Sequence, residues 1–444
     1  MRRIIVASLL ALPFLSVPAS AGPSYTGDPL AKGVGKDMVP VAHIAYPSGT
    51  DIEFATVKGR DYAVAPSQGN NGGLRLINID KPEKPKVTGF LRCPVSQNDV
   101  QVRGTLVLLG IDGGASSGDS DAQCFKQLGA EATTGLMVIS IADPAKPRAI
   151  GFLPMKHGVH NATWHPGGRY VYISDSELTP EIAVPFGGRI QIVDVGNPRK
   201  PRELSTYLLV GDRMSTHDIT FNKKGTRAYV AALQETYILD TTSPAEPKEV
   251  ARIEDPSINI SHGADPTPDG KYLLVTDEQA GAAANGVCNV GGVHVFDISI
   301  NEKVPVKVGF YFLDPVNSVT ATTNSGNLTC TAHVLDYSAD GKTWTNGNYA
   351  AGVRLLSATA LLGRPTELAY FTATDANTWS AKTYKNPRYV FANDLKRGFD
   401  VYKWVPGKGE VDTRAPGDKI AFRPAAKAPQ TGLGTYCFDL VNRR

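Results

Sequence analysis

Short runs of alternating apolar and polar residues recur along the chain, separated by turns that contain proline or glycine. In one recurring pattern, an apolar run leads into a Pro-x-x-Pro turn and then into a second short apolar run. Four copies of this pattern cover residues 74–91, 136–153, 190–209 and 237–253, and a looser copy covers residues 293–312. Alternation on both sides of a proline turn is typical of two strands joined by a tight connection.

A second pattern precedes each copy of the first. It consists of a short strand, a polar turn with glycine and an aromatic-rich strand, as in NATWHPGGRYVYISD (161–175) and DITFNKKGTRAYVAAL (218–233). Together the two patterns make a four-stranded unit, and seven such units fit between about residues 51 and 404. We therefore predict an all-β, seven-bladed β-propeller of antiparallel blades. A pair of β-sandwiches is the alternative, but sandwiches do not produce a repeating unit of this length.

The seventh unit stops at residues 399–404 and lacks its outer strand. The segment PVAHIAYP (40–47) is similar to PKVTGFLRCP in the first unit, so we expect it to supply that strand and close the ring. These observations divide the chain into a leader (1–21), an N-terminal arm (22–39), the propeller (40–404) and a C-terminal tail (405–444).

The leader has the features of a cleaved secretory signal peptide. Arg2 and Arg3 precede an apolar stretch that contains Pro13, and Ala19-Ser20-Ala21 is the small-residue cleavage signal. No later stretch reaches the roughly 18 apolar residues of a membrane span. We expect a secreted or periplasmic protein cleaved after Ala21.

Export makes the five cysteines candidates for disulfides. Cys93 ends the first unit and Cys124 lies in a long connection of the second, so adjacent blades bring them to one face. Cys288 and Cys330 are related in the same way in the fifth unit and the approach to the sixth. We predict these two pairs and leave Cys437 unpaired.

The repeats also carry a family resemblance. Most of residues 40–404 resembles the LVIVD-repeat family of exported propellers. The resemblance is carried by the strands LRLINI, IQIVDV and VHVFDI, by the proline turns that follow them, and by TWSA…YVFANDLKRGFDV near the end. The arrangement is more distantly similar to the propellers of the selenium-binding protein and methanethiol oxidase family. The first resemblance implies fold and export. The second would imply a copper site, but its metal motif does not match this sequence residue by residue.

One face of the predicted propeller concentrates the long connections. Residues 112–134, 177–188 and 279–291 each join a second strand to a third, and residues 313–330 lead into an innermost strand. Antiparallel alternation places all four on one face. Because loops on a rigid scaffold carry function, this face is the candidate site.

Four of the eight histidines begin innermost strands on that face, in consecutive units: His160, His217, His262 and His333. In the other three units the matching neighbourhoods hold Asp51, Asn98 with Asp99, and Trp379. We expect the imidazoles to form a crescent around the mouth of the central channel. Second strands end on the same face with Asp175, Glu177, Asp277, Glu278 and Asp394.

Imidazoles backed by carboxylates suit a transition metal, copper or zinc in particular. The four histidines are therefore candidate metal ligands, and the carboxylates and Trp379 are candidate ligand-binding residues. A histidine at a repeated blade position can instead bond only a neighbouring backbone carbonyl, and a metal-free ligand site is a third interpretation. The sequence leaves all three open.

Composition narrows the function without deciding it. The formal charge is +3, and it falls to +1 without the leader, so nothing points to nucleic acid as a partner. Serine-hydrolase elbows, P-loops and Rossmann fingerprints are absent from the sequence. We expect an exported binding or scaffold propeller whose His-lined face holds a small molecule, a glycan or a protein. The alternative is a copper- or zinc-dependent enzyme, oxidase-like, with the metal held by the crescent.

Overall fold

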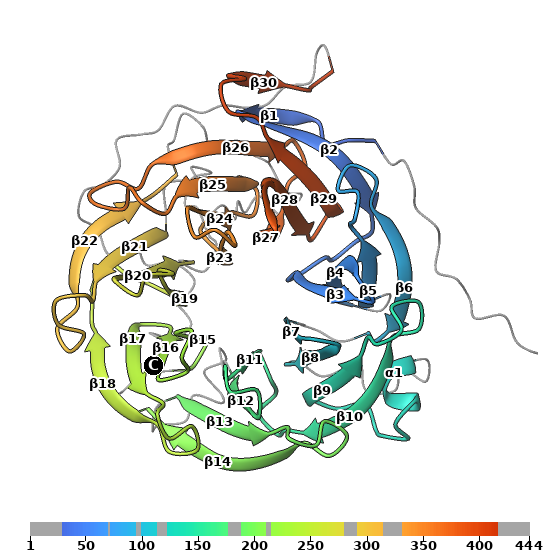
Figure 1. Ribbon diagram of the computed structural model, residues 1–444, viewed down its shortest axis with the longest axis vertical. Coiled ribbons are helices and arrows are strands. Elements are labelled where there is room, and N and C mark those ends of the chain that lie inside the picture. Colours follow the sequence, from blue (N-terminus) through green and yellow to red (C-terminus); the bar gives the residue numbers. More distant parts are fainter. Residues whose placement is uncertain are drawn as a thin grey trace, which may run out of the picture.

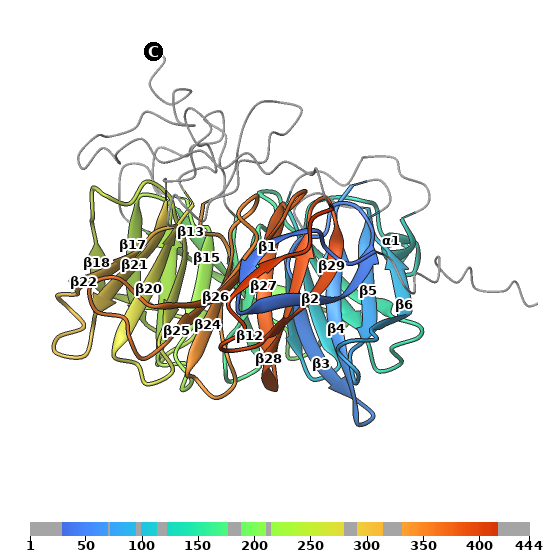
Figure 2. The same ribbon diagram turned by 90° about the horizontal axis from the view of Figure 1, so that it is seen from above.

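The computed structural model describes residues 29–69, 72–94, 99–112, 122–175, 188–209, 215–278, 291–313 and 331–415. In this part of the chain, seven antiparallel sheets stand around a central channel, as the view down the axis shows (Figure 1). Seen edge-on, the ring is a flat disc with the strands running across its thickness (Figure 2). The prediction of an all-β, seven-bladed propeller is confirmed.

Consecutive strands build each blade outward from the channel. The first blade consists of β3 (Glu53–Val57), β4 (Arg60–Ser67), β5 (Gly73–Asn78) and β6 (Lys86–Arg92). The second consists of β7 (Val100–Arg103), β8 (Leu106–Ile111), β9 (Gly135–Ser140) and β10 (Arg148–Pro154). The third consists of β11 (Asn161–Trp164), β12 (Tyr170–Ser174), β13 (Arg189–Asp194) and β14 (Arg202–Leu208). The fourth consists of β15 (Asp218–Phe221), β16 (Arg227–Ala232), β17 (Glu235–Asp240) and β18 (Lys248–Ile253).

The last three blades complete the ring and receive both ends of the described chain. The fifth consists of β19 (Ser261–Pro266), β20 (Tyr272–Asp277), β21 (Gly292–Asp297) and β22 (Val306–Tyr311). The sixth consists of β23 (Leu335–Tyr337), β24 (Thr343–Gly347), β25 (Val353–Ser357) and β26 (Glu367–Ala373). Outside β26 it gains β1 (Gly33–Lys36) and β30 (Glu410–Asp412). The seventh consists of β27 (Thr378–Tyr384), β28 (Asn386–Asp394), β29 (Gly398–Trp404) and β2 (Met38–Ala45).

The repeated proline turns connect the third strand of a blade to its fourth. The second proline of each of the four pairs is buried, at Pro85, Pro147, Pro201 and Pro247. A register shift follows in the same strand pair of every blade, for example between Leu76 and Ile77 in β5. Such bulges increase local twist, which bends the outer strand around the blade.

Apolar side chains form the core between neighbouring blades rather than inside one blade. Val64 and Leu76 of the first blade, for example, share a buried cluster with Val107 and Met137 of the second. Each blade therefore depends on its neighbours for burial, and the ring positions the inner strands rigidly around the channel.

The N-terminal strand closes the ring as predicted. β2 pairs with β29, and Ala45 lies opposite Gly398. Burial alternates along β2, with Met38 and Ile44 almost fully buried. The strand begins at Met38, two residues before the predicted start of the propeller. The segments assigned to the N-terminal arm and the C-terminal tail also contribute strands, because β1 pairs with both β26 and β30.

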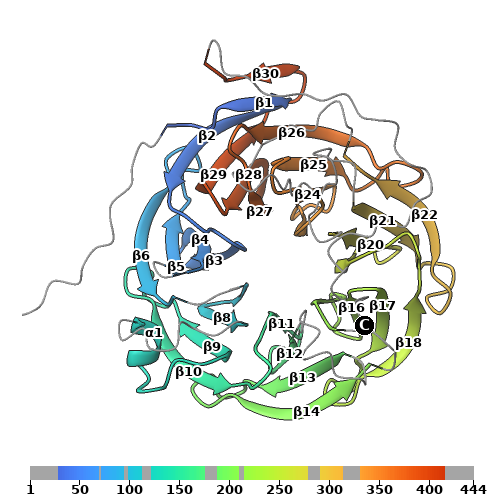
Figure 3. The ribbon, with the colours of Figure 1, turned by 180° about the vertical axis from the view of Figure 1, so that it is seen from behind.

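One predicted disulfide is confirmed. Cys93 and Cys124 are bonded, with their Cα atoms 5.3 Å apart. The bond ties the short helix α1 (Gln123–Lys126) to the end of β6, and α1 lies at the outer edge of the second blade in the views from both faces (Figures 1 and 3). Cys288, Cys330, Cys437 and the leader lie outside the described residues. Among the residues that are described, no helix has the length and apolarity that a membrane crossing requires.

Candidate functional site

The four predicted histidines lie next to one another at one end of the channel. His160 and His217 directly precede β11 and β15, His262 is in β19, and His333 precedes β23. Successive ring centroids are 4.3, 4.1 and 4.1 Å apart, and each side chain belongs to a residue that is 2% to 6% exposed. Trp379 continues the series into the seventh blade, because its ring lies 4.5 Å from that of His333. We call the four imidazoles the histidine crescent.

Two members of the crescent are oriented by backbone carbonyls of the next blade. Nδ1 of His217 donates to the carbonyl of His262 at 3.0 Å, and Nδ1 of His333 donates to the carbonyl of Trp379 at 2.8 Å. A carbonyl only accepts, so the proton of a neutral ring sits on Nδ1 and Nε2 keeps its lone pair. The carbonyl contact expected of a structural blade histidine is thus present, and it leaves the lone pair on Nε2 as the acceptor of each ring.

His160 differs from its neighbours in charge. Its Nδ1 lies 2.8 Å from Oδ2 of Asp112, and its Nε2 lies 3.0 Å from Nε2 of His217. Because Nε2 of His217 is an acceptor, His160 donates from both nitrogens and is an imidazolium. Burial alone would lower the pKa of His160, but the hydrogen bond and charge of Asp112 outweigh it and raise that pKa.

The middle of the crescent is neutral. Burial lowers the pKa of both His217 and His262 well below the ordinary value, and the charge of the neighbouring imidazoles adds to the effect. Protons therefore do not compete for these two rings near neutral pH. Nδ1 of His262 has no hydrogen-bond partner in the described part of the chain.

A carboxylate joins these two neutral imidazoles. One ligand atom each from His217, His262 and Glu278 lie within 4.8 Å of one another. Glu278 follows β20 and accepts a hydrogen bond from the hydroxyl of Tyr349 at 2.5 Å, and its Oε1 lies 3.9 Å from Nε2 of His333. Two imidazoles and one carboxylate are a donor set found at catalytic zinc sites. Of the five predicted carboxylates, Glu278 is the one that the structure brings to the crescent within the described residues.

Three other predicted carboxylates are occupied by the fold itself. Oδ2 of Asp175 lies 2.8 Å from Nε of Arg189. Asp277 accepts hydrogen bonds from the backbone N–H groups of Asn259 and Ile260. Asp394 accepts from the backbone N–H groups of Asn377, Lys396 and Arg397. These contacts account for their burial, and their ligand-binding role stays a prediction. Glu177 lies outside the described residues.

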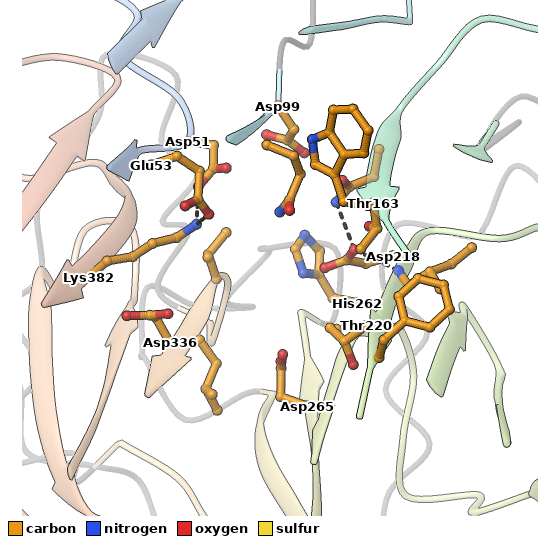
Figure 4. Close-up of a pocket in the computed structure, with 18 of the residues that line it drawn as sticks. Asp51, Glu53, Asp99, Thr163, Asp218, Thr220, His262, Asp265, Asp336 and Lys382 are labelled. Carbon is orange, nitrogen blue, oxygen red and sulfur yellow. Dashed lines mark hydrogen bonds and ion pairs between the residues drawn. The ribbon is translucent and has the colours of Figure 1, made fainter. Parts of the chain in front are cut away.

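A cavity of about 280 Å³ occupies the channel next to the crescent, and His262 and His333 both line it. Lys382 and six carboxyl side chains also line it (Figure 4), namely Asp51, Glu53, Asp99, Asp218, Asp265 and Asp336. Nζ of Lys382 lies 2.8 Å from Glu53 Oε1 and 3.0 Å from Asp51 Oδ1. Four carboxyls in this cavity thus lack a cation of their own among the lining residues.

Burial makes these four carboxyls weak acids. It raises the pKa of Asp99, Asp265 and Asp336 to about 7 and that of Asp218 to about 8. A neighbouring carboxylate adds to the effect, as Asp336 does for Asp265. The sequence analysis noted Asp51 and Asp99 but did not identify this acidic cavity. The sequence contained a pattern that could have predicted this cavity, because the carboxyls stand at alternate positions at the start of the innermost strands.

Comparisons with known proteins agree on the fold. No family model and no curated protein matches the chain. The chain is similar to the β-propeller domain of Cps50 (Swd1) from Myceliophteria thermophila, with a TM-score of 0.55 and 13% identity over 82% of this chain and 99% of that one. It is also similar to a functionally unknown protein from Desulfotomaculum acetoxidans DSM 771, with a TM-score of 0.51 and 14% identity over 74% and 87% of the two chains.

A third similar structure is a Bacteroides fragilis NCTC 9343 protein described provisionally as a 6-phosphogluconolactonase. Its TM-score is 0.52, with 11% identity over 86% of this chain and 96% of that one. At such low identity, all three similarities show a shared propeller fold and nothing about chemistry.

Proposed function

We propose that this protein is an exported propeller that binds one copper or zinc ion at the mouth of its channel, through His217, His262 and Glu278. The observation that carries the proposal is the convergence of these three ligand atoms within 4.8 Å. The resemblance of the repeats to the LVIVD-repeat family supports the export and the fold on which the proposal rests.

The electrostatics of the donor set support binding near neutral pH. Metal ions bind neutral imidazole, and burial lowers the pKa of both His217 and His262. Neighbouring groups orient two of the ligands, because the carbonyl of His262 fixes the ring of His217 and the hydroxyl of Tyr349 fixes the carboxylate of Glu278. Such outer contacts are typical of metal sites.

The positive charge of His160 excludes this residue from the set of metal ligands. This imidazolium donates a hydrogen bond to Nε2 of His217, so an ion that binds this nitrogen has to displace that hydrogen bond, and His160 could itself join the ion only by releasing its proton. Asp112 opposes that release by stabilising the charge. We therefore assign His160 as a flanking group and His333 as the other flank, beside Glu278.

A metal-dependent enzyme is the second candidate function. The observation that favours it is the cavity, since His262 and His333 line it and a substrate there would reach the crescent directly. The carboxylates of the cavity argue against one particular substrate class. A phosphorylated sugar acid, such as the product of a 6-phosphogluconolactonase, would be repelled by the carboxylates that surround it.

Metal content tests the proposal. We expect about one equivalent of copper or zinc per chain in protein purified without an affinity tag, and a higher melting temperature when either ion is titrated into metal-free protein. The variant with both His217→Ala and His262→Ala should lose the ion and the thermal shift while remaining folded. His157→Ala is the matched control, because His157 is close in sequence to the crescent and is not part of the donor set.

The proposal fails if untagged protein holds no stoichiometric metal and neither ion changes the melting temperature. The crescent would then be a structural series of neighbouring rings, two of which are held by backbone carbonyls. A circular dichroism spectrum of the double variant that matches the parent protein excludes loss of the fold as the reason for lost binding.

A further inference from the structure

The carboxyls of the channel are arranged on two levels. The first level lies one residue after the position that corresponds to a crescent histidine, and it holds Asp51, Asp99 and Asp218. The second level lies two residues further along the innermost strand of a blade, and it holds Glu53, Asp265 and Asp336. Positions two residues apart in a strand have the same side-chain direction. Two residues of a strand advance by about 7 Å, so the second level lies about that much deeper in the channel. Figure 4 shows these groups surrounding the cavity.

The negative charge is local to this channel. The whole chain carries a formal charge of +3, so its surface has no general attraction for cations. In the cavity, Lys382 faces six carboxyls and pairs directly with Asp51 and Glu53. A narrow acidic channel concentrates field lines and attracts cations.

The spacing of the carboxyls does not match a calcium site built from several carboxylates. Calcium takes six to eight oxygen ligands at about 2.3–2.6 Å. Within the described residues, His217, His262 and Glu278 are the group whose ligand atoms lie within 4.8 Å of one another. No three carboxyls of the channel come this close together in the described part of the chain. A ligand that pairs with several of these carboxyls therefore has to carry its positive charges at separate points along its length.

Two residues that line the cavity each have a buried polar atom without a partner. His262 is 6% exposed, its Nδ1 has no hydrogen bond within the described chain, and Figure 4 shows its ring directed into the cavity. Oδ1 of Asp99 is likewise buried without a hydrogen bond. Buried polar atoms normally have partners. An ammonium group, which has three N–H donors and no acceptor, would satisfy Oδ1 of Asp99, and it would satisfy Nδ1 of His262 in the tautomer that carries the ring proton on Nε2.

The cavity is also elongated and partly aromatic. Along β11 and the turn after it, the lining residues run from Asn161 through Thr163 and Trp164 to Pro166, so the cavity follows the strand across the disc. Trp164 and Phe221 contribute aromatic surface. Aromatic faces favour contact with both methylene groups and cations.

We propose that this channel binds a linear aliphatic polyamine, with its ammonium groups between the two carboxyl levels and its methylene chain along the aromatic wall. This proposal goes beyond the metal site, because the residues that would hold the polyamine are the channel carboxyls, and His262 is the one residue that lines the cavity and also belongs to the metal donor set.

Spermidine is the probe. We expect isothermal titration calorimetry on the metal-free mature protein at pH 8 to show one saturable site, weakened by added sodium chloride. An uncharged molecule of similar length, 1,8-octanediol, should give no saturable binding. Binding that is equally strong for the diol would overturn the proposal, because charge recognition would then be absent.

Charge-removing variants locate the site. Asp265→Asn and Asp336→Asn keep the side-chain shape and should each weaken spermidine binding by about tenfold, the factor that corresponds to about 1.4 kcal/mol for one lost charge-assisted contact. Glu254→Gln is the matched control, because the side chain of Glu254 is 69% exposed and lies outside the cavity. The affinity of this variant for spermidine should stay within about twofold of that of the parent protein. Spermidine affinity that is unchanged in both asparagine variants would overturn the proposal.

Two further outcomes separate this proposal from others. Calcium binding that competes with spermidine and is lost in the same asparagine variants would overturn it in favour of a hard-cation site. His217→Ala should lose transition-metal binding and keep spermidine binding, because His217 does not line the cavity. Loss of spermidine binding in that variant, with the fold intact, would show that the amine binds at the crescent instead.

Discussion

Replacing Asp265 with asparagine is expected to stabilise the protein more at pH 8 than at pH 5. Burial in the channel, and then the nearby Asp336, raise the pKa of Asp265 from 3.8 to about 7 in the folded protein. In the unfolded chain the pKa stays near 3.8. Between these two values the folded state holds a proton that the unfolded state has released, so the free energy of unfolding falls as the pH rises. Above about pH 7 both states are ionised and the fall ends.

The magnitude follows from the width of this interval. One pKa unit corresponds to about 1.36 kcal/mol, so the wild-type protein loses about 3 kcal/mol from this group between pH 5 and pH 7. Asparagine does not titrate and has no such loss. The advantage of Asp265→Asn over the wild type should therefore grow by about 3 kcal/mol over the same interval and then stay constant to pH 8.

Urea denaturation monitored by tryptophan fluorescence at pH 5, 6, 7 and 8 measures this difference. Asp297→Asn is the control, because hydrogen bonds from Ser299 lower the pKa of Asp297, and its carboxylate is ionised in both states across this range. Its effect should not change between pH 5 and pH 8. A constant difference between Asp265→Asn and the wild type would show that Asp265 ionises normally and would refute the reasoning.

Three further predictions concern closure, cross-linking and charge. Deleting residues 22–45 removes β1 and β2. The loss of the buried Met38 and Ile44 of β2 should cost about 2–5 kcal/mol for each side chain, and the exposed blade edges should cause aggregation in size-exclusion chromatography. Replacing Cys93 and Cys124 with serine opens a loop with a sequence separation of 31 and should cost about 3–4 kcal/mol in denaturant titrations. Asp112→Asn should lower the pKa of His160, measured by NMR of the imidazole nitrogens, because only the charges of Asp99 and Glu278 then oppose the effect of burial.

Each of these has a clear contrary result. A truncated protein that melts like the parent would mean that β2 is not needed for closure. If the serine variants have the same free energy of unfolding as the parent under oxidising conditions, the Cys93–Cys124 disulfide does not stabilise the protein by constraining the unfolded chain. A pKa of His160 that is unchanged in Asp112→Asn would assign its charge to other groups, such as Asp99.

The sequence predicted the ring and the crescent because both depend on repetition. Periodic burial and proline turns define a blade locally, and identical register places His160, His217, His262 and His333 at equivalent points of four neighbouring blades. Distances between those points then follow from the symmetry of the ring. The closing strand was predictable for the same reason, since residues 40–47 repeat the outer strand of another blade.

Contacts specific to single side chains were not predictable. Asp112 stands at the start of a long connection, and only the structure shows that it reaches His160. Asp175 and Asp394 are equivalent in register to Asp277, which directly precedes Glu278, and they bond to Arg189 and to backbone N–H groups, respectively. The acidic cavity combines residues from different blades at alternating positions, and its charge becomes apparent only when the blades are arranged around one axis.

Closure by β2 also has a consequence for how the chain folds. β2 is synthesised before the inner strands of every blade, and its partner β29 follows the other six blades in the sequence. The six blades before it can form from consecutive strands, but the seventh must wait for the two ends to meet. Non-local pairings of this kind are slow, and unpaired edges aggregate in the meantime. The last step of folding is therefore an encounter between the ends of the ring, and a chain exported unfolded would need protection from aggregation until that encounter takes place.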